Sequence, residues 1–335
     1  DMLVRNVLPH YPQVGMDQYV DVVVDELLLE WISLVAWPVI PLMGLTLWVA
    51  PFVKQRRQQT RAFAVLSFLL FVVGWLTDAT GRMVLTQPVI GNGLGLAGAG
   101  LQMAAAMVYL AGVWRSVSRP LVPSVVDLLL QFGALWLLGA AGMHFAYSLG
   151  VTLDYHGREY LRAFVALHGC FVLGFVGNTG IWLMHSLLPR FFGLAELRGR
   201  SVRPMLFYNI VLAGWGMGLA WCVQFPLTWV RLPLALVSVA LPAAAIYLLV
   251  DLELISLLGA STQTNRRFLG RAAASVAMVG MVMGAVLAGG IGFWLGASSE
   301  VIIPEAAQAL REVLRLGFGS NLIVMLFVCL LGARA

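Results

Sequence analysis

The sequence predicts an all-α fold, a polytopic transmembrane helical bundle of about nine spans. Three observations lead to this prediction. The 335-residue chain is 60% hydrophobic and 11% charged, with a mean hydropathy of +0.88, whereas a soluble domain has about 25% charged residues. Apolar runs long enough to cross a bilayer recur along the whole length. Arginine-rich loops alternate with loops that carry little net charge.

The chain begins with a predicted extramembrane arm, residues 1–28, and continues as a helical bundle, residues 29–335. The first span, at about 29–53, contains Pro38 and Pro41, so we expect it to kink. The third span is rich in glycine and alanine, which allows close contact between helices. The spans after the first are predicted at about 62–85, 90–114, 121–149, 160–188, 205–224, 227–250, 270–296 and 316–333.

The distribution of basic residues predicts the topology. Basic clusters follow the first, third, fifth and seventh spans, and the other loops are poor in arginine or balanced by acids. Because basic loops stay on the cytoplasmic side, the N-terminus is expected outside and the C-terminus inside. The basic residues lie in short loops, so the net charge of +5 does not indicate a nucleic-acid partner. The expected environment is the lipid bilayer.

A short repeat suggests two similar halves. REYLR followed by Gly-Phe in the fifth span recurs as REVLR-LGF before the ninth. This pattern predicts two four-span units, residues 62–188 and 205–333, in the same orientation. The second unit contains no histidine, so a histidine-based site belongs to the first.

Two histidines lie in the predicted fourth and fifth spans, which a short outer loop connects. Counted from Asp154 in that loop, His144 is ten residues away and His168 fourteen. Because antiparallel helices joined by a short loop are usually neighbours, we expect both side chains at similar depth in the outer half of the bundle. Two facing neutral imidazoles are suitable ligands for b-type haem or for copper. The alternative is that each histidine hydrogen-bonds a neighbouring helix and binds no cofactor.

Further polar candidates lie in the same spans. Asp78 and Arg82 are four residues apart and therefore share one helix face. They form either an internal ion pair or a site where Arg82 binds a haem propionate or an anionic substrate and Asp78 orients it. His185, near the inner end of the fifth span, either forms a second metal site in the inner leaflet with a methionine ligand or is an interfacial polar residue. Additional contacts inside the bundle are expected from Gln102, Tyr109, Tyr147 and Asn178.

The cysteines do not indicate a cofactor site. Cys170, Cys222 and Cys329 each lie alone in an apolar run, and the sequence has no CxxC or CxxCH pattern. Neither a zinc site nor covalent c-type haem is therefore supported. Each cysteine is expected to be a small buried hydrophobic side chain.

The segment HGCFVLGFVGNTGIWLMHSLLPRFFG resembles a span of the NnrS family of polytopic membrane proteins and, more distantly, the haem-copper oxidase superfamily. A second segment, from Gly74 through Arg82 and on to GAGLQMAAAMVYLAGVWRSVSRP, is similar to another part of that family. Together the two segments cover about a quarter of the chain. The matching positions of the first are His168, Phe171, Gly174, Phe175, Ile181, Pro189, Arg190, Phe191 and Gly193.

The resemblance implies a multi-pass protein of the bacterial inner (cytoplasmic) membrane that binds haem b or copper, with His168 as a ligand. It implies electron transfer, nitric oxide handling or respiratory metabolism, alongside other membrane or periplasmic redox subunits. The sequence also departs from the family. The Trp-His-x-His-Glu segment and any adjacent His-His pair are absent, and nine spans are predicted rather than twelve. A catalytic oxygen or nitric oxide reductase centre is therefore not supported.

Two other functions stay open. A membrane permease is suggested by the two-unit repeat and by the glycine runs and prolines that could break helices around a site at the membrane midplane. These prolines are Pro38, Pro41, Pro226, Pro233 and Pro242. Few charged groups reach the midplane, which counts against this function. The other alternative is a cofactor-free structural subunit of a respiratory assembly.

Overall fold

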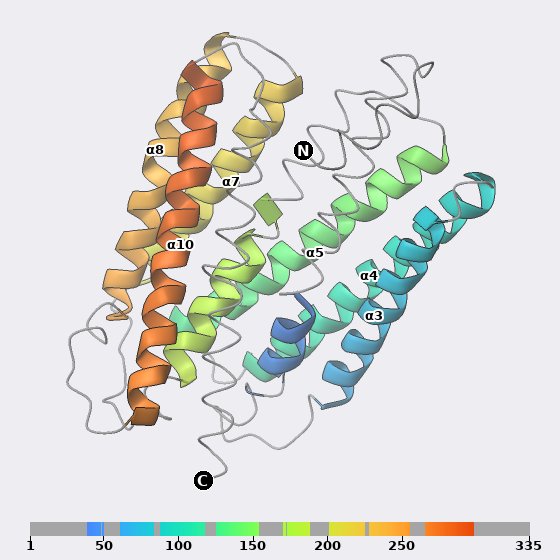
Figure 1. The fold of residues 1–335 in the computed structure, drawn as a ribbon, viewed down its shortest axis with the longest axis horizontal. Helices are drawn as coiled ribbons and strands as arrows, with labels where there is room; N and C mark the ends of the chain where they lie inside the picture. Colours follow the sequence, from blue (N-terminus) through green and yellow to red (C-terminus); the bar gives the residue numbers. More distant parts are fainter. Residues whose placement is uncertain are drawn as a thin grey trace. The chain divides into compact units, whose positions relative to one another are not determined.

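A computed structural model describes a set of ranges in which almost every residue is helical and none is in a strand. These ranges are 39–47, 49, 61–83, 88–117, 125–153, 170–171, 173–187, 201–224, 228–254 and 265–297. The long helices are α3 (Arg61–Met83), α4 (Pro88–Val117), α5 (Val125–Thr152), α7 (Arg203–Gln224), α8 (Thr228–Asp251) and α10 (Asn265–Ala297) (Figure 1). Residues 170–171 and 173–187 are also helical, and we name them together the Cys170 helix. The all-α prediction is confirmed for these residues.

The helices begin and end close to the predicted limits. The predicted spans at 62–85, 205–224 and 227–250 correspond to α3, α7 and α8, each within a few residues. By contacts, the chain divides into two compact units, Asp1–Trp37 and Pro38–Ala335, and every described residue lies in the second. The N-terminal arm and the predicted ninth span lie outside the described residues, as do parts of the first and fifth spans. The count of nine spans, the orientation and the four-span repeat therefore stay predictions.

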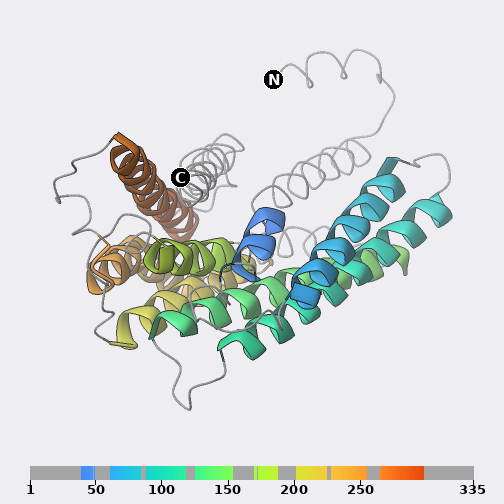
Figure 2. The same ribbon diagram turned by 90° about the horizontal axis from the view of Figure 1, so that it is seen from below.

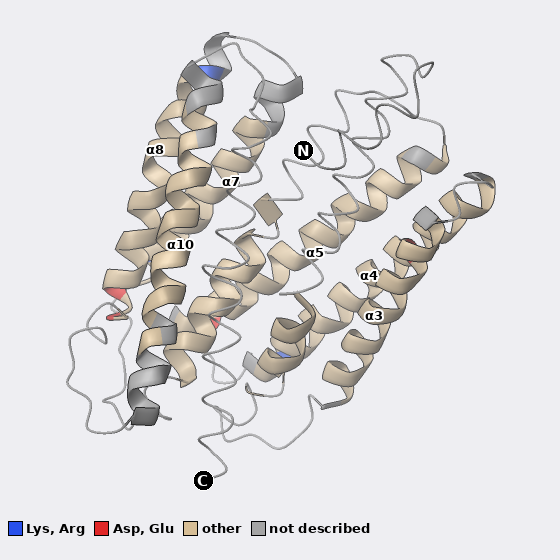
Figure 3. Ribbon diagram, in the orientation of Figure 1, with Lys and Arg blue, Asp and Glu red and all other residues tan. Residues whose placement is uncertain are grey.

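Four of the described helices are long and apolar enough to cross a membrane. Their surface points to the same environment, because large apolar side chains face outward. On α3 alone, about half of each of these side chains is exposed: Val65, Leu66, Phe68, Leu69, Val73 and Leu76. Charged residues are rare along the described helices (Figure 3). The fold is therefore that of a helical bundle compatible with a lipid bilayer. The four spans are Ala62–Gly81, Val89–Ser116, Val126–Gly150 and Arg231–Asp251.

Neighbours in the sequence pack against each other. α3 packs on α4 and α4 on α5, while α8 packs on both α7 and α10. α3 and α4 run side by side in both views (Figures 1 and 2). Their backbones approach closely because both helices carry glycine at the crossing. A Cβ on Gly98 would lie 2.6 Å from the Gly74 carbonyl oxygen and 2.8 Å from the Asp78 Cβ, so only glycine fits there.

The Cys170 helix contacts both α5 and α7. Its Phe171 ring packs against Trp136 of α5, with 5.2 Å between ring centroids. Its Cys170 thiol donates a hydrogen bond to the Leu212 carbonyl oxygen of α7 over 3.2 Å. Cys170 is buried, as the sequence predicts. Through these contacts the Cys170 helix joins α5 to α7.

Candidate functional site

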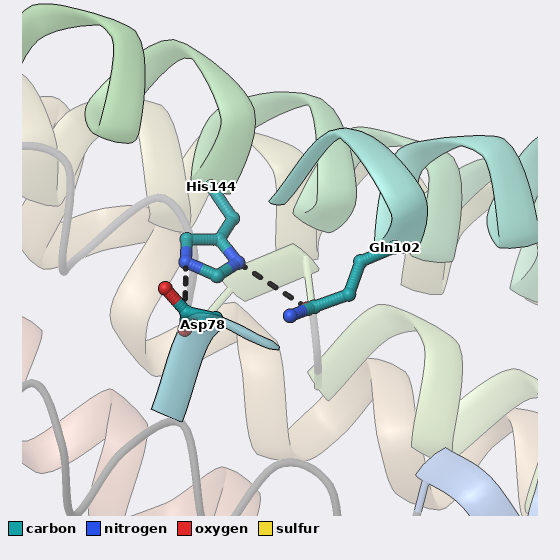
Figure 4. A network of polar contacts seen from close by, with 3 residues as sticks. All are labelled: Asp78, Gln102 and His144. Carbon is teal, nitrogen blue, oxygen red and sulfur yellow. Dashed lines mark hydrogen bonds and ion pairs between the residues drawn. The ribbon is translucent and has the colours of Figure 1, made fainter. Parts of the chain in front are cut away.

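Asp78, Gln102 and His144 form a network of polar contacts (Figure 4). They come from α3, α4 and α5 respectively. The His144 Nε2 atom lies 3.5 Å from the Asp78 Oδ2 atom, and the His144 Nδ1 atom lies 3.3 Å from the Gln102 Oε1 atom. All three side chains are buried, with exposed fractions of 0%, 6% and 3%. An ionisable pair is thus held away from the surface of the bundle.

The glycines of α4 make room for the carboxyl group. A Cβ on Gly95 would lie 3.6 Å from the Asp78 Oδ1 atom, and Gly98 faces the backbone of Asp78 directly. Because α3 and α4 approach closely here, a short side chain such as that of Asp78 reaches past α4 to His144 on α5. The same approach brings the backbone nitrogen of Gln102 against Gly74. The glycine-lined crossing therefore positions two of the three polar residues.

The orientation of the Gln102 amide determines the charge of this site. With Oε1 facing His144, both ring nitrogens lie near oxygen acceptors, an arrangement that suits an imidazolium beside the carboxylate. In this orientation the Gln102 Nε2 atom has no hydrogen-bond partner among the described residues. A rotated amide would instead donate to a neutral ring. The site can thus hold its proton in two ways that differ by one amide rotation.

A second polar contact lies two turns further along α4. The hydroxyl groups of Tyr109 and Thr46 are 2.7 Å apart and buried. Thr46 also donates to the Leu42 carbonyl oxygen at 2.7 Å. The Tyr109 ring packs edge-on against Phe175 of the Cys170 helix, with centroids 6.0 Å apart. Tyr109 therefore connects residues 39–47, α4 and the Cys170 helix.

A pair of asparagines joins the Cys170 helix to α7. Asn178 and Asn209 exchange two hydrogen bonds of 3.0 and 3.1 Å. The Trp136 indole of α5 donates to the Asn209 Oδ1 atom at 2.6 Å. The remaining amide hydrogens are donated to the carbonyl oxygens of Gly174 and Met205. Since these donors are satisfied internally, the asparagine pair stabilises the packing of three helices.

His185 lies at the other end of the Cys170 helix. Its exposed fraction is 9%, and its Nε2 atom has no hydrogen-bond partner among the described residues. The carboxylates of Asp127 and Glu253 are close enough to interact with it electrostatically. Asp127 and His144 are 17 residues apart on α5, which is about 25 Å along the helix. His185 is therefore remote from His144, and the two belong to different sites.

The predicted site residues are brought together only in part. Asp78 and His144 were each predicted as site residues, but their contact with each other was not. Gln102 was expected to make a polar contact and does so. The Arg82 side chain and the whole of His168 lie outside the described residues, so the Asp78–Arg82 ion pair and the His144–His168 pair stay predictions.

Asn209 and Thr46 were not among the residues predicted to make polar contacts. Each is a single polar residue in an apolar helix, like many that bind nothing. The only signal for Asn209 was a second asparagine, Asn178, in another apolar run. Tyr109 was expected to make a polar contact, but nothing in the sequence pairs it with Thr46, which lies 63 residues earlier.

The described residues contain no group of three or more His, Cys, Asp and Glu side chains placed to hold an ion. Both ring nitrogens of His144 face other side chains, so neither presents a free lone pair in this conformation. A ligand role for His144 requires Gln102 to move away from Nδ1.

Comparison of the chain with protein-family models, with curated proteins and with solved structures gives no match. The resemblance to the NnrS family stays a prediction carried by the quoted segments. The function is therefore argued from the geometry of the chain itself.

Proposed function

We propose that this chain is a multi-pass membrane protein that takes up and releases a proton at Asp78 and His144, as a proton-coupled permease does. The observation that carries the proposal is the contact between a carboxyl group and an imidazole, both buried among apolar helices. Ionisable groups inside membrane helices are rare and costly, and they usually mark an ion or proton site. This proposal develops the permease alternative of the sequence analysis.

The energetics favour a shared proton. Removing one partner of a buried ion pair costs about 3–5 kcal/mol, because the other charge is left uncompensated. A carboxylate and an imidazolium together are neutral overall, and so are a carboxylic acid and a neutral imidazole. The pair can therefore pass a proton between its members without adding net charge to the apolar interior. Uptake of this proton neutralises a site that carries one negative charge, that of a carboxylate beside a neutral imidazole. Gln102 accommodates either state of the ring by rotating its amide.

Nuclear magnetic resonance of protein labelled with ¹⁵N-histidine tests the proposal. We expect the His144 ring, assigned with His144→Gln, to change protonation state as the pH is varied. Asp78→Asn should alter that response, because it replaces the contacting carboxylate. The matched control is Asp127→Asn, which changes a carboxylate about 25 Å away along α5 and should leave the His144 response as in the wild type. A ring that stays in one protonation state, together with an Asp78 carboxyl group whose C=O stretch in infrared spectra does not change with pH, would refute the proposal.

A second candidate function is binding of haem b or copper by His144. The observation that favours it is the carboxylate at Nε2, since metal-binding histidines usually donate their other ring N–H to a carboxylate. In this candidate Asp78 would orient the ring, Nδ1 would be the ligand atom, and Gln102 would swing away. A bound haem or copper ion would supply one-electron chemistry. His168 and Arg82 would be its further ligand and its propionate partner.

Absorbance spectroscopy separates this candidate from the first. A reduced-minus-oxidised spectrum with b-type bands, or stoichiometric copper by metal analysis, would establish a cofactor. Loss of the signal in both His144→Ala and His168→Ala would establish the ligands. A colourless, metal-free and folded protein would refute this candidate. If His144 also failed to titrate, the cofactor-free structural subunit would be favoured instead.

A further inference from the structure

We infer that an anionic phospholipid of the bilayer binds at one end of the α3–α4 pair, through the exposed Arg115 side chain and the apolar surface beside it. The headgroup phosphate contacts Arg115, and an acyl chain lies along exposed apolar side chains of the two helices. We name this place the Arg115 site and define it by Phe63, Trp114 and Arg115. Phe63 and Asp78 are 15 residues apart on α3, about 22 Å, so the Arg115 site is separate from the proton site and does not depend on it.

The packing of α3 on α4 places Arg115. A Cβ on Gly81 would lie 2.6 Å from the Gly91 carbonyl oxygen, and one on Gly112 would lie 2.9 Å from the Phe63 Cβ. Later residues of α3 thus meet earlier residues of α4, so the helices are antiparallel and the start of α3 lies beside the end of α4. The Arg115 guanidinium carbon, three residues beyond Gly112, lies 4.9 Å from the centre of the Phe63 ring. This contact holds the arginine at a defined position on the surface.

Arg115 and Trp114 suit the level of the lipid headgroups. Stacking on the Phe63 ring uses a face of the guanidinium, so the N–H groups around its edge can donate to phosphate oxygens. Arginine binds phosphate through two parallel hydrogen bonds of this kind. The Arg115 side chain is exposed, which allows a headgroup to reach it. Trp114 is 52% exposed, and tryptophan is enriched where headgroups meet acyl chains.

Exposed apolar side chains continue from the Arg115 site along both helices. On α4, Met107 lies seven residues before Trp114 on the same helix face, and it is 48% exposed. On α3, Val65 and Leu69 are four residues apart and each is 52% exposed. A surface of this kind contacts acyl chains in a bilayer. A phospholipid carries its phosphate and its acyl chains in one molecule, so it fits this order of polar and apolar groups better than a free phosphate.

The surrounding charge favours a headgroup with a net negative charge. The acidic side chains of the described parts of α3, α4 and α5 are Asp78 and Asp127, which are 0% and 2% exposed, so neither presents a carboxylate at this surface. Residues 31–126 contain seven basic residues and one acidic residue. Six of the seven lie at 54–61 and 115–119, close in the sequence to the start of α3 and the end of α4. The other five side chains of these six lie outside the described residues, and Arg115 is the one assigned to the site. Basic residues beside a membrane span attract anionic lipids.

The test is quenching of tryptophan fluorescence by brominated lipids, with the full chain in bilayers. Phosphatidylglycerol and phosphatidylcholine with the same brominated acyl chains are compared at equal mole fraction. The Trp114 signal is the difference between proteins with and without Trp114→Phe. We expect phosphatidylglycerol to quench Trp114 more strongly than phosphatidylcholine, which has no net charge.

Variants assign this preference to Arg115. Arg115→Gln should lower the relative affinity for phosphatidylglycerol by about fivefold, as for loss of one basic residue near a charged membrane surface. Arg115→Lys should retain most of the preference, because the charge remains. The matched control is Arg203→Gln, which removes an exposed arginine at the start of α7 and should leave the Trp114 signal as in the wild type.

Equal quenching of Trp114 by the two lipids in the wild type would overturn the inference, and so would a preference that persists unchanged in Arg115→Gln. In about 1 M salt, where charges are screened within about 3 Å, the preference should weaken, and a preference that salt leaves unchanged would contradict electrostatic binding. Loss of the preference on addition of glycerol phosphate alone would show a phosphate site in place of a lipid site. None of these results depends on the protonation of Asp78 or His144, so the inference and the proposed function can fail separately.

Discussion

Replacing Gly98 with alanine should separate α3 from α4 and disturb the polar site. A Cβ on Gly98 would lie 2.5 Å from the Asp78 backbone nitrogen and 2.6 Å from the Gly74 carbonyl oxygen. Both are backbone atoms, which cannot rotate aside as a side chain can. To restore an ordinary contact of 3.4 Å, the helices must part by about 0.9 Å.

The expected cost follows from this displacement. Overpacking that forces backbone shifts typically costs about 1–3 kcal/mol. Alanine favours a helix over glycine by about 1 kcal/mol, which offsets part of that cost. We therefore expect Gly98→Ala to lower the free energy of unfolding by up to about 2 kcal/mol. The matched control is Gly93→Ala on the same helix, where nothing lies within 4 Å of the added Cβ. That variant should be neutral or more stable by up to about 1 kcal/mol.

Reversible unfolding in mixed detergent micelles measures the two variants side by side. Infrared spectroscopy of the Asp78 carboxyl group in Gly98→Ala adds a local reading, because the displacement moves Asp78 relative to His144. If Gly98→Ala proved as stable as Gly93→Ala, with an unchanged carboxyl signal, the close α3–α4 crossing would be wrong. The glycines of α4 would then not be what positions Asp78 beside His144.

Three further sets of variants probe the hydrogen bonds between helices by the same unfolding measurement. Asn178→Leu and Asn209→Leu should each cost about 1–3 kcal/mol, because the other amide loses its partner side chain. The double variant should cost less than the sum of the two single variants. Strict additivity would show that the two amides do not interact. Thr46→Val should cost about 1 kcal/mol. Adding Tyr109→Phe should cost little more, because both substitutions remove the hydrogen bond between the Thr46 and Tyr109 hydroxyl groups. A second loss of about 1 kcal/mol would show that the two hydroxyl groups do not share this bond. Trp136→Phe should cost at least about 1 kcal/mol through loss of its donor to Asn209; an unchanged free energy of unfolding would contradict the stabilising role of this bond.

Some of the site was predictable from the sequence. Asp78, His144 and His185 stood out because a charged or titratable side chain in an apolar run is costly without a partner. The contact between Asp78 and His144 was not predictable, because they are 66 residues apart and nothing in their spacing relates them. The basic residue nearest to Asp78 in the sequence is Arg82, four residues later. Their pairing was predicted because residues four apart share one face of a helix. A local pattern thus identifies candidate residues but not their partners in other helices.

The sequence by itself determined the helices and their apolar character. Runs of about 20 apolar residues form helices in a bilayer because every backbone hydrogen bond must be satisfied within the segment. This constraint is local, so the predicted spans agree with α3, α7 and α8 within a few residues.

The tertiary structure alone decided which helix faces meet. Apolar surfaces are nearly equivalent in lipid, so pairing depends on small residues and single polar contacts that local periodicity does not reveal. Here the glycines of α3 and α4 set a crossing close enough for Asp78 to reach His144. Asn178, Asn209 and Trp136 likewise fix the contacts of the Cys170 helix. The site exists because these few positions bring separate helices together.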